Sequence, residues 1–171
     1  EMKELKTILL YIVGVCAVIV VVGVLTNRNQ GKPLFGSLEL PVQTSTLQTY
    51  KKIRVGNVDL SVSVADDTEK RRVGLSETAS LANNEGMLFV FDSQNTQPIF
   101  WMKDMEIDID IIWINDGKIT KIDSNVAAPK PGTPDKQLPL YKSNTVVDYV
   151  LETAAGWTQK YNIKVGDEVA L

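Results

Sequence analysis

Histidine is absent from the 171 residues of the sequence, and cysteine occurs only once, as Cys16. Without histidine the chain has no Ser-His-Asp or Cys-His catalytic centre, no histidine-ligated zinc or iron site and no histidine-based pH switch. One cysteine forms neither an intrachain disulfide nor a pair of metal-binding thiolates. The chain also lacks a Walker-type or GxGxxG phosphate-binding motif and an Asn-x-Ser/Thr sequon, so the usual signals of nucleotide binding and N-glycosylation are missing.

Charged residues are missing from an 18-residue run near the start of the sequence, residues 8–25. As an α-helix this run would extend about 27 Å, close to the thickness of the hydrocarbon core of a bilayer. A soluble buried helix usually carries a polar stripe, and a cleaved signal peptide usually ends at a small-x-small site, whereas this run ends with Leu25-Thr26-Asn27-Arg28. The pattern therefore predicts a short tail over residues 1–7 and an uncleaved transmembrane helix over residues 8–25.

The charges on the two sides of this run do not fix its orientation. Lys3 and Lys6 precede it, and Arg28 and Lys32 follow it, so the positive-inside rule gives a tie. We expect a single-pass protein of the cell membrane whose folded domain lies on the extracytoplasmic side.

Two further regions follow the apolar run. Residues 26–52 are rich in Gln, Thr, Ser, Gly and Pro without a hydrophobic period, which is typical of a flexible tether spanning about 28 Å. Residues 53–171 are predicted to form a single β-rich domain. This part holds 12 Lys and Arg against 18 Asp and Glu, hence a net charge of −6, which argues against nucleic-acid binding.

Short strands separated by turn signals recur through the domain. Gly56-Asn57 separates residues 53–55 from an alternating run over 58–64, which predicts a hairpin, and Asp66-Asp67-Thr68 is a start signal for a helix over 69–81. The remaining expected elements are strands over 86–91, 99–102, 107–113, 118–123 and 146–152, a short helix over 155–160 and a hairpin over 163–171 around Gly166-Asp167. The expected fold class is mainly β, a β-sandwich-like fold or small barrel with one or two short helices, preceded by a transmembrane helix.

Several short blocks occur in the order typical of one known family. The blocks are Val64-Ala65-Asp66, Thr68, Arg71, Gly74-Leu75, Gly86-Met87-Leu88-Phe89-Val90-Phe91, Phe100-Trp101-Met102-Lys103, Ile107-Asp108-Ile109-Asp110-Ile111-Ile112, Tyr149-Val150-Leu151-Glu152, Ala155-Gly156 and Gly166-Asp167. Over residues 60–170 this set resembles the bacterial and archaeal domain of unknown function 192. The resemblance implies a compact β-sandwich-like fold, often behind a signal or anchor, and no settled biochemical activity.

The chain departs from the pattern of this family at three places. It reads Gly74-Leu75-Ser76 where members usually read GLM, and Lys103-Asp104-Met105 where they read KNT. Leu138 stands near the place of a cysteine that many members carry. Roles that depend on the replaced side chains are not carried over to this chain.

Charged side chains that match family positions form the first candidate site. Arg71, Lys103, Asp110 and Glu152 could converge beside Trp101 as a small polar pocket suited to a carboxylate, a sugar or a peptide end. The alternative is a structural network in which Arg71 pairs with Asp110 or Glu152 and pins the helix to the sheet.

A row of carboxylates forms a weaker candidate metal site. Glu106, Asp108 and Asp110 alternate with isoleucines, so in a strand they would project from one face at intervals of about 6.6 Å. Such a row could hold a hard cation such as calcium, or it could be the solvated outer face of a half-buried strand. Ser76 resembles the serine of a nucleophile elbow, but the last glycine and the histidine base are missing, so we predict no catalytic residue and no cofactor.

These observations favour a membrane-anchored extracytoplasmic β-domain that binds a small ligand or an envelope component. The alternative hypothesis is a histidine-free, hydrolase-like enzyme that acts on an envelope polymer or a small metabolite. A passive structural or assembly subunit is the third possibility. The first two hypotheses require the candidate side chains to surround one cavity that solvent can reach.

Overall fold

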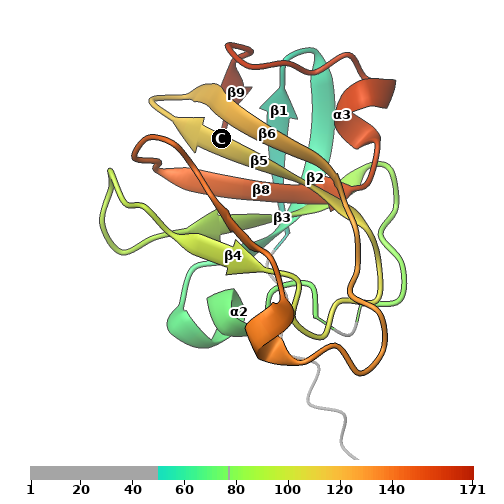
Figure 1. Ribbon diagram of the computed structural model, residues 1–171. Coiled ribbons are helices and arrows are strands. Elements are labelled where there is room, and N and C mark those ends of the chain that lie inside the picture. The colour runs from blue at the N-terminus through green and yellow to red at the C-terminus, as the bar shows by residue number, and fades with distance from the viewer. Residues whose placement is uncertain (1–49, 77) are drawn as a thin grey trace, which may run out of the picture. The chain divides into compact units, whose positions relative to one another are not determined.

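The computed structural model describes residues 50–76 and 78–171, which form a curled seven-stranded sheet with two short α-helices (Figure 1). The strand order is β6-β5-β8-β3-β2-β1-β9, and a separate two-stranded sheet pairs β4 with β7. The elements are β1 (Tyr50–Val55), β2 (Val58–Ala65), α2 (Thr68–Val73), β3 (Glu85–Val90), β4 (Ile99–Trp101), β5 (Ile109–Asn115), β6 (Lys118–Val126), η1 (Asp135–Gln137), β7 (Leu140–Lys142), β8 (Tyr149–Ala154), α3 (Trp157–Lys160) and β9 (Val169–Ala170). The prediction of a mainly β fold with short helices is confirmed, with an open curled sheet as its architecture.

The predicted transmembrane segment, residues 8–25, and most of the tether over 26–52 lie outside the described residues. Within the described part of the chain, no helix is long and apolar enough to cross a membrane. The first strand begins at Tyr50, slightly before the domain start expected at residue 53.

The predicted hairpin at Gly56-Asn57 is confirmed, because β1 and β2 pair antiparallel with Val55 opposite Val58. After β2 the chain crosses through α2 and returns as β3, which pairs parallel to β2. The side chain of Asp67 caps α2 by accepting a hydrogen bond from the backbone N–H of Lys70 at 2.7 Å.

The predicted helix over 69–81 is wrong in its length, because α2 ends at Val73. Gly74 adopts a positive φ of 54° and donates its backbone N–H to the carbonyl of Lys70, which terminates the helix. Because L-residues with side chains rarely adopt this φ, a larger residue at Gly74 would strain the backbone. The sequence after Gly74 therefore follows the surface as a loop toward β3.

Two hydrophobic cores lie on opposite faces of the central strands. In β3, Leu88 belongs to one core while Met87 and Phe89 belong to the other, as the alternation of side chains in a strand requires. Helix α3 contributes Trp157 to the first core, and the second core is covered by the loop after α2 and by β4. Figure 1 shows α2 and β4 below the sheet and α3 beside its upper right end.

The predicted C-terminal hairpin over 163–171 is wrong, because this segment pairs with two distant strands. β9 pairs antiparallel with β1, placing Val169 opposite Val55. Ile119 of β6 exchanges two backbone hydrogen bonds with the segment before β9, donating to Asp167 at 3.0 Å and accepting from Gly166 at 2.8 Å. The segment thus connects β6, at one edge of the sheet, with β1, near the other edge.

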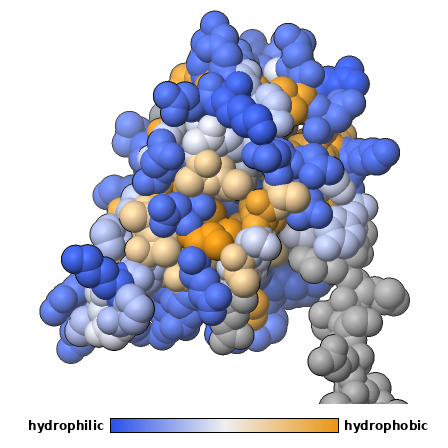
Figure 2. All heavy atoms as spheres, turned by 90° about the vertical axis from the view of Figure 1, so that its right-hand side faces the viewer, coloured by the Kyte–Doolittle hydropathy of each residue, from blue (hydrophilic) through white to orange (hydrophobic). Residues whose placement is uncertain are grey.

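The strand and helix predicted near the end of the domain are confirmed as β8 and α3. Figure 2 views the molecule from the right-hand side of Figure 1 and shows hydrophilic side chains over most of that face, with apolar residues gathered near its centre. Among the described residues, the most exposed large apolar side chains include Ile99 and Trp101 of β4 and Leu140 of β7.

Candidate functional site

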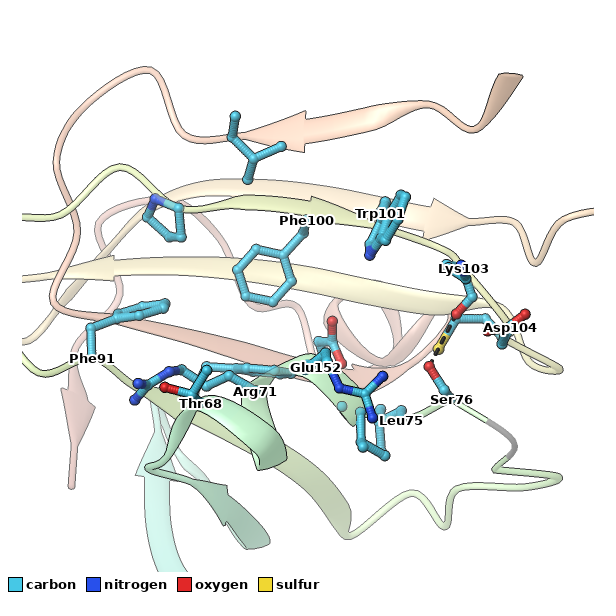
Figure 3. Close-up of a pocket in the computed structure, with 17 residues that line it drawn as sticks. Thr68, Arg71, Leu75, Ser76, Phe91, Phe100, Trp101, Lys103, Asp104 and Glu152 are labelled. Carbon is cyan, nitrogen blue, oxygen red and sulfur yellow. Dashed lines mark hydrogen bonds between the residues drawn. The ribbon is translucent and has the colours of Figure 1, made fainter. Parts of the chain in front are cut away.

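A cavity of about 760 Å³ lies between α2, β4 and the sheet. Its lining comes from α2 and the loop after it, from β3, from β4 and the loop after it, and from β8. We call this cavity the α2–β4 pocket. Figure 3 shows Glu152 and Phe100 in its middle, with Arg71 and Phe91 toward one end and Ser76, Lys103 and Asp104 toward the other.

Glu152 is the buried polar group of the α2–β4 pocket. Strand β8 lies between β3 and β5, and the two residues opposite Glu152 are the apolar Met87 and Ile111. The side chain is 5% exposed, and its Oε2 atom has no hydrogen-bond partner among the described residues. Burial raises the pKa of this carboxyl from 4.5 to about 8, so the proton-bearing form predominates at neutral pH.

Arg71 reaches the pocket from α2 but does not pair with Asp110 or Glu152, so that prediction is wrong. Its guanidinium donates to the backbone carbonyl of Val90 at 2.7 Å and forms an ion pair with Asp92 at 3.0 Å. Asp92 lies two residues after the end of β3, so the carboxylate partner of Arg71 comes from the turn that follows this strand. Arg71 therefore ties α2 to the end of β3 while it lines the pocket.

Lys103 and Trp101 lie at the end of β4. The Lys103 Nζ atom is 2.6 Å from a carboxylate oxygen of Asp135 and 5.4 Å from the ring centroid of Trp101. The hydrogen bond and charge of Asp135 raise the pKa of Lys103 above its ordinary value. Trp101 is 46% exposed and lines the pocket, so an aromatic face is available to a ligand.

Asp110, the remaining candidate, is not among the residues that line the α2–β4 pocket. It is fully buried, and its two oxygens accept hydrogen bonds from the backbone N–H groups of Asn125, Gly156 and Thr158 and from the Thr158 hydroxyl, at 2.6 to 3.0 Å. The carboxylate therefore has a complete set of protein donors. It holds the end of β6 and the start of α3 against β5.

The carboxylate row over 106–110 does not form on one strand face, because β5 begins only at Ile109. Glu106 and Asp108 lie before the strand and are exposed, and Asp108 accepts a hydrogen bond from the backbone N–H of Ala128 at 2.7 Å. Among residues 50–76 and 78–171, no group of three or more acidic or cysteine side chains is placed to hold a metal ion.

The structure brings Arg71, Trp101, Lys103 and Glu152 to one cavity and leaves Asp110 outside it. It also adds pocket residues that were not proposed from the sequence, among them Arg72, Phe100 and Asp104. Ser76 and Met105 line the pocket as well, so the departures from the family pattern at 76, 104 and 105 fall at this site. Ser76 donates its hydroxyl to the carbonyl of Lys103 at 3.0 Å and so joins the loop after α2 to the loop after β4.

The arrangement suits a small organic molecule with one polar group and an apolar body. A cavity of this size falls in the ordinary range for small-ligand sites. Phe89, Phe100 and Leu75 supply apolar walls, and Glu152 is a buried polar group that can donate or accept a hydrogen bond. A reactive centre would need a second carboxyl group, and the other one that lines the pocket is Asp104.

Comparisons with known proteins agree with the fold. The model of the DUF192 family, described as "Uncharacterized ACR, COG1430", matches residues 51–171. A crystal structure from Sinorhizobium meliloti 1021, of a protein described provisionally as a transcription regulator, is similar with 27% identity and a TM-score of 0.63, covering 71% of this chain and 93% of that one. A protein of unknown function from Novosphingobium aromaticivorans DSM 12444 is similar in fold with 21% identity and a TM-score of 0.67, covering 76% of this chain and 91% of that one. A search of curated proteins found no match.

Proposed function

This chain belongs to the DUF192 family, and we propose that its β-domain is a binding module for a small organic ligand. The observation that carries the proposal is the convergence of Arg71, Trp101, Lys103 and Glu152 on one cavity from three separate parts of the chain. A buried carboxyl group without a partner costs free energy, and a ligand that supplies the missing hydrogen bond would offset that cost.

We further propose that the module is displayed from a membrane. The apolar run over residues 8–25 would anchor it, residues 26–52 would tether it, and the domain would lie on the extracytoplasmic side. Fusion of the C-terminus to a phosphatase that is active only outside the cytoplasm, and in parallel to a fluorescent protein that matures only inside, tests this arrangement. Phosphatase activity in the membrane fraction supports the proposal, and fluorescence without phosphatase activity contradicts it.

Nucleic acid is not the expected partner. The Sinorhizobium protein is described provisionally as a transcription regulator, but residues 53–171 of this chain carry a net charge of −6. A surface of that charge repels phosphate backbones, which attract proteins through basic patches.

A thermal-shift screen of the full chain in a non-ionic detergent tests ligand binding. A compound present at about 100 times its Kd stabilises the folded state by about 2.7 kcal/mol, which raises the Tm measurably. The shift should be lost in Trp101→Ala, which removes the exposed aromatic wall of the pocket. Leu140→Ala is the matched control, because Leu140 lies opposite Trp101 in the β4–β7 pair, is 64% exposed and does not line the pocket. Equal shifts in both variants would place the ligand elsewhere and contradict the proposal.

A histidine-free, hydrolase-like enzyme is the second candidate. The observation that favours it is that two carboxyl groups line the same cavity, of which Glu152 is desolvated and Asp104 is exposed. A raised pKa suits a general acid, and an exposed carboxylate suits a base. Turnover of any compound found in the screen, lost in both Glu152→Gln and Asp104→Asn, would favour the enzyme; binding without turnover favours the binding module.

A further inference from the structure

The basic side chains that line the α2–β4 pocket already have acidic partners. Each forms an ion pair with a carboxylate outside the lining: Arg71 with Asp92 at 3.0 Å, Arg72 with Glu69 at 2.6 Å and Lys103 with Asp135 at 2.6 Å. The positive charge near the pocket is therefore balanced within the protein, and little of it is left to attract an anionic ligand.

The acidic side chains that line the pocket, in contrast to the basic ones, form no ion pair among the described residues. Glu152 is buried and its Oε2 atom has no partner among the described residues, and Asp104 takes part in no ion pair there. The strand neighbours that face Glu152 are Met87 and Ile111, so no charged group of the sheet compensates its carboxylate. After the pairs are counted, the described lining keeps the negative charge of Asp104, and Glu152 adds a second one when it ionises.

Aromatic rings make up the walls that flank Glu152. Phe89, Phe91, Phe100 and Trp101 all line the pocket, and Phe89 and Phe100 pack edge to face with centroids 4.8 Å apart. The face of an aromatic ring carries negative partial charge and attracts a cation within about 6 Å of its centroid. Figure 3 shows the ring of Phe100 directed into the pocket toward Glu152.

We propose that the α2–β4 pocket binds an organic cation, an ammonium group on an apolar body, whose charge pairs with the carboxylate of Glu152. This inference rests on the proposed function and names its ligand class. Asp104, at the end of the pocket with Lys103 and Ser76, would attract the cation during entry, and the aromatic side chains would contact both the ammonium group and the apolar body.

The charge of Glu152 couples such binding to protons. In the empty pocket, burial raises the pKa of Glu152 to about 8, so the group is neutral in most molecules at pH 7. Pairing with an ammonium group requires the ionised form, so each cation that binds displaces close to one proton into the solvent. The other charged groups among the described residues that line the same pocket are Arg71, Arg72, Lys103 and Asp104.

Isothermal titration calorimetry on the full chain in a non-ionic detergent provides the test. Benzylamine is the cationic probe, and benzoate and benzyl alcohol are the anionic and neutral probes of similar shape. At pH 7, we expect benzylamine to bind with release of close to one proton, measured from the difference between phosphate and Tris buffers. Its apparent affinity should rise roughly tenfold from about pH 6 to about pH 7, because the competent ionised fraction of Glu152 rises by that factor.

Two variants identify the group responsible. Glu152→Gln keeps the shape of the side chain without its charge and should abolish both the binding of benzylamine and the proton release. Glu168→Gln, an exposed change outside the pocket, should leave both unchanged. If Glu152→Gln alters folding, Asp104→Asn provides a milder test. It should weaken the binding of benzylamine several-fold without changing any binding of benzyl alcohol.

The results separate the ligand class from the binding function. Binding of benzoate or benzyl alcohol without benzylamine would overturn the cation proposal and leave the binding module standing. Binding of benzylamine without proton release, or equally in Glu152→Gln, would also overturn it. Failure of all three probes at millimolar concentration would overturn the cation proposal, and a thermal-shift screen without any stabilising compound would then remove the binding module as well.

Discussion

Thr158 donates two hydrogen bonds to the same oxygen of Asp110, one from its backbone N–H at 2.9 Å and one from its hydroxyl at 2.6 Å. The two residues are far apart in the sequence, yet both are buried at the junction of β5 and α3. One oxygen of the Asp110 carboxylate thus accepts hydrogen bonds from Thr158 in the first turn of α3. The other oxygen accepts hydrogen bonds from the backbone N–H groups of Asn125 and Gly156. Asp110 is a structural anchor for this end of the sheet.

Replacing Asp110 with Ala should destabilise the domain by about 3–5 kcal/mol, because three backbone N–H groups and a hydroxyl lose their acceptor in a buried site. Denaturant unfolding of the variant measures the change. Asp108→Ala is the matched control, since Asp108 is exposed and accepts one backbone hydrogen bond, and it should cost less than about 1 kcal/mol. Similar losses in both variants would show that Asp110 is not an anchor.

Glu152 should make the stability of the domain fall as the pH rises. Its pKa is 4.5 when exposed and about 8 in the folded protein, so between these values the folded state holds a proton that the unfolded state has released. The contribution of this group to the free energy of unfolding then decreases by about 1.4 kcal/mol per pH unit within that window and is constant outside it. The chain has no histidine, so no other side chain with an ordinary pKa titrates in the middle of this range.

The measurement is a series of urea melts from pH 5 to pH 8 on the wild type and on Glu152→Gln. The difference between the two free energies of unfolding isolates Glu152, because the other acidic groups are common to both proteins. Glu152→Gln should gain relative stability steadily as the pH rises. A difference that does not vary with pH would contradict a buried, protonated Glu152.

Arg71→Ala should cost only about 1–2 kcal/mol. The ion pair joins a guanidinium that is 17% exposed to Asp92, which is 81% exposed, so water replaces much of the lost interaction. The remaining cost comes from the carbonyl of Val90, which loses its donor. Thermal or denaturant melts check this value, with Asp92→Ala as a control expected to change stability by less than about 0.5 kcal/mol; a loss above about 3 kcal/mol in Arg71→Ala would reveal a buried anionic partner.

Phe89→Ala and Phe91→Ala should differ clearly in stability. Phe89 is 2% exposed in the centre of β3 and packs against Phe100, so its loss should cost about 3–5 kcal/mol. Phe91 follows the strand and is half-buried, so its loss should cost about half as much or less. Equal free energies of unfolding for the two variants would show that the burial of β3 is not as described.

Short sequence patterns predicted the elements whose structure depends on residues that are close together in the sequence. The hairpin at Gly56-Asn57 follows from turn chemistry and alternation, and the structure has it. The strand expected over 146–152 is present as β8. The predicted length of α2 was wrong because Gly74 ends the helix. The parallel pairing of β2 with β3 has no local signal, since it depends on how the crossover packs.

The residues of the candidate site also divide into those whose role the sequence could indicate and those whose contacts it could not. Glu152 was singled out from the sequence because it matches a family position, and the structure leaves it buried and without a partner among the described residues. The partner of Arg71 could not be predicted, because Asp92 lies in a turn whose position relative to α2 is set by the path of β3. The partners of Asp110 are mostly backbone N–H groups, which every residue type carries, so no sequence pattern indicates them.

The pairing of β9 with β1 has a consequence for biosynthesis. Strand β1 gains its second neighbour only from β9, around Val169 and Ala170, which lies more than 110 residues later in the sequence. Until those residues emerge, the outer edge of β1 keeps unpaired backbone groups that a chaperone or another nascent chain could bind. The sheet is therefore complete only after β9 has been translated, and a stop codon just before Val169 would leave the other strands made but the edge of β1 open.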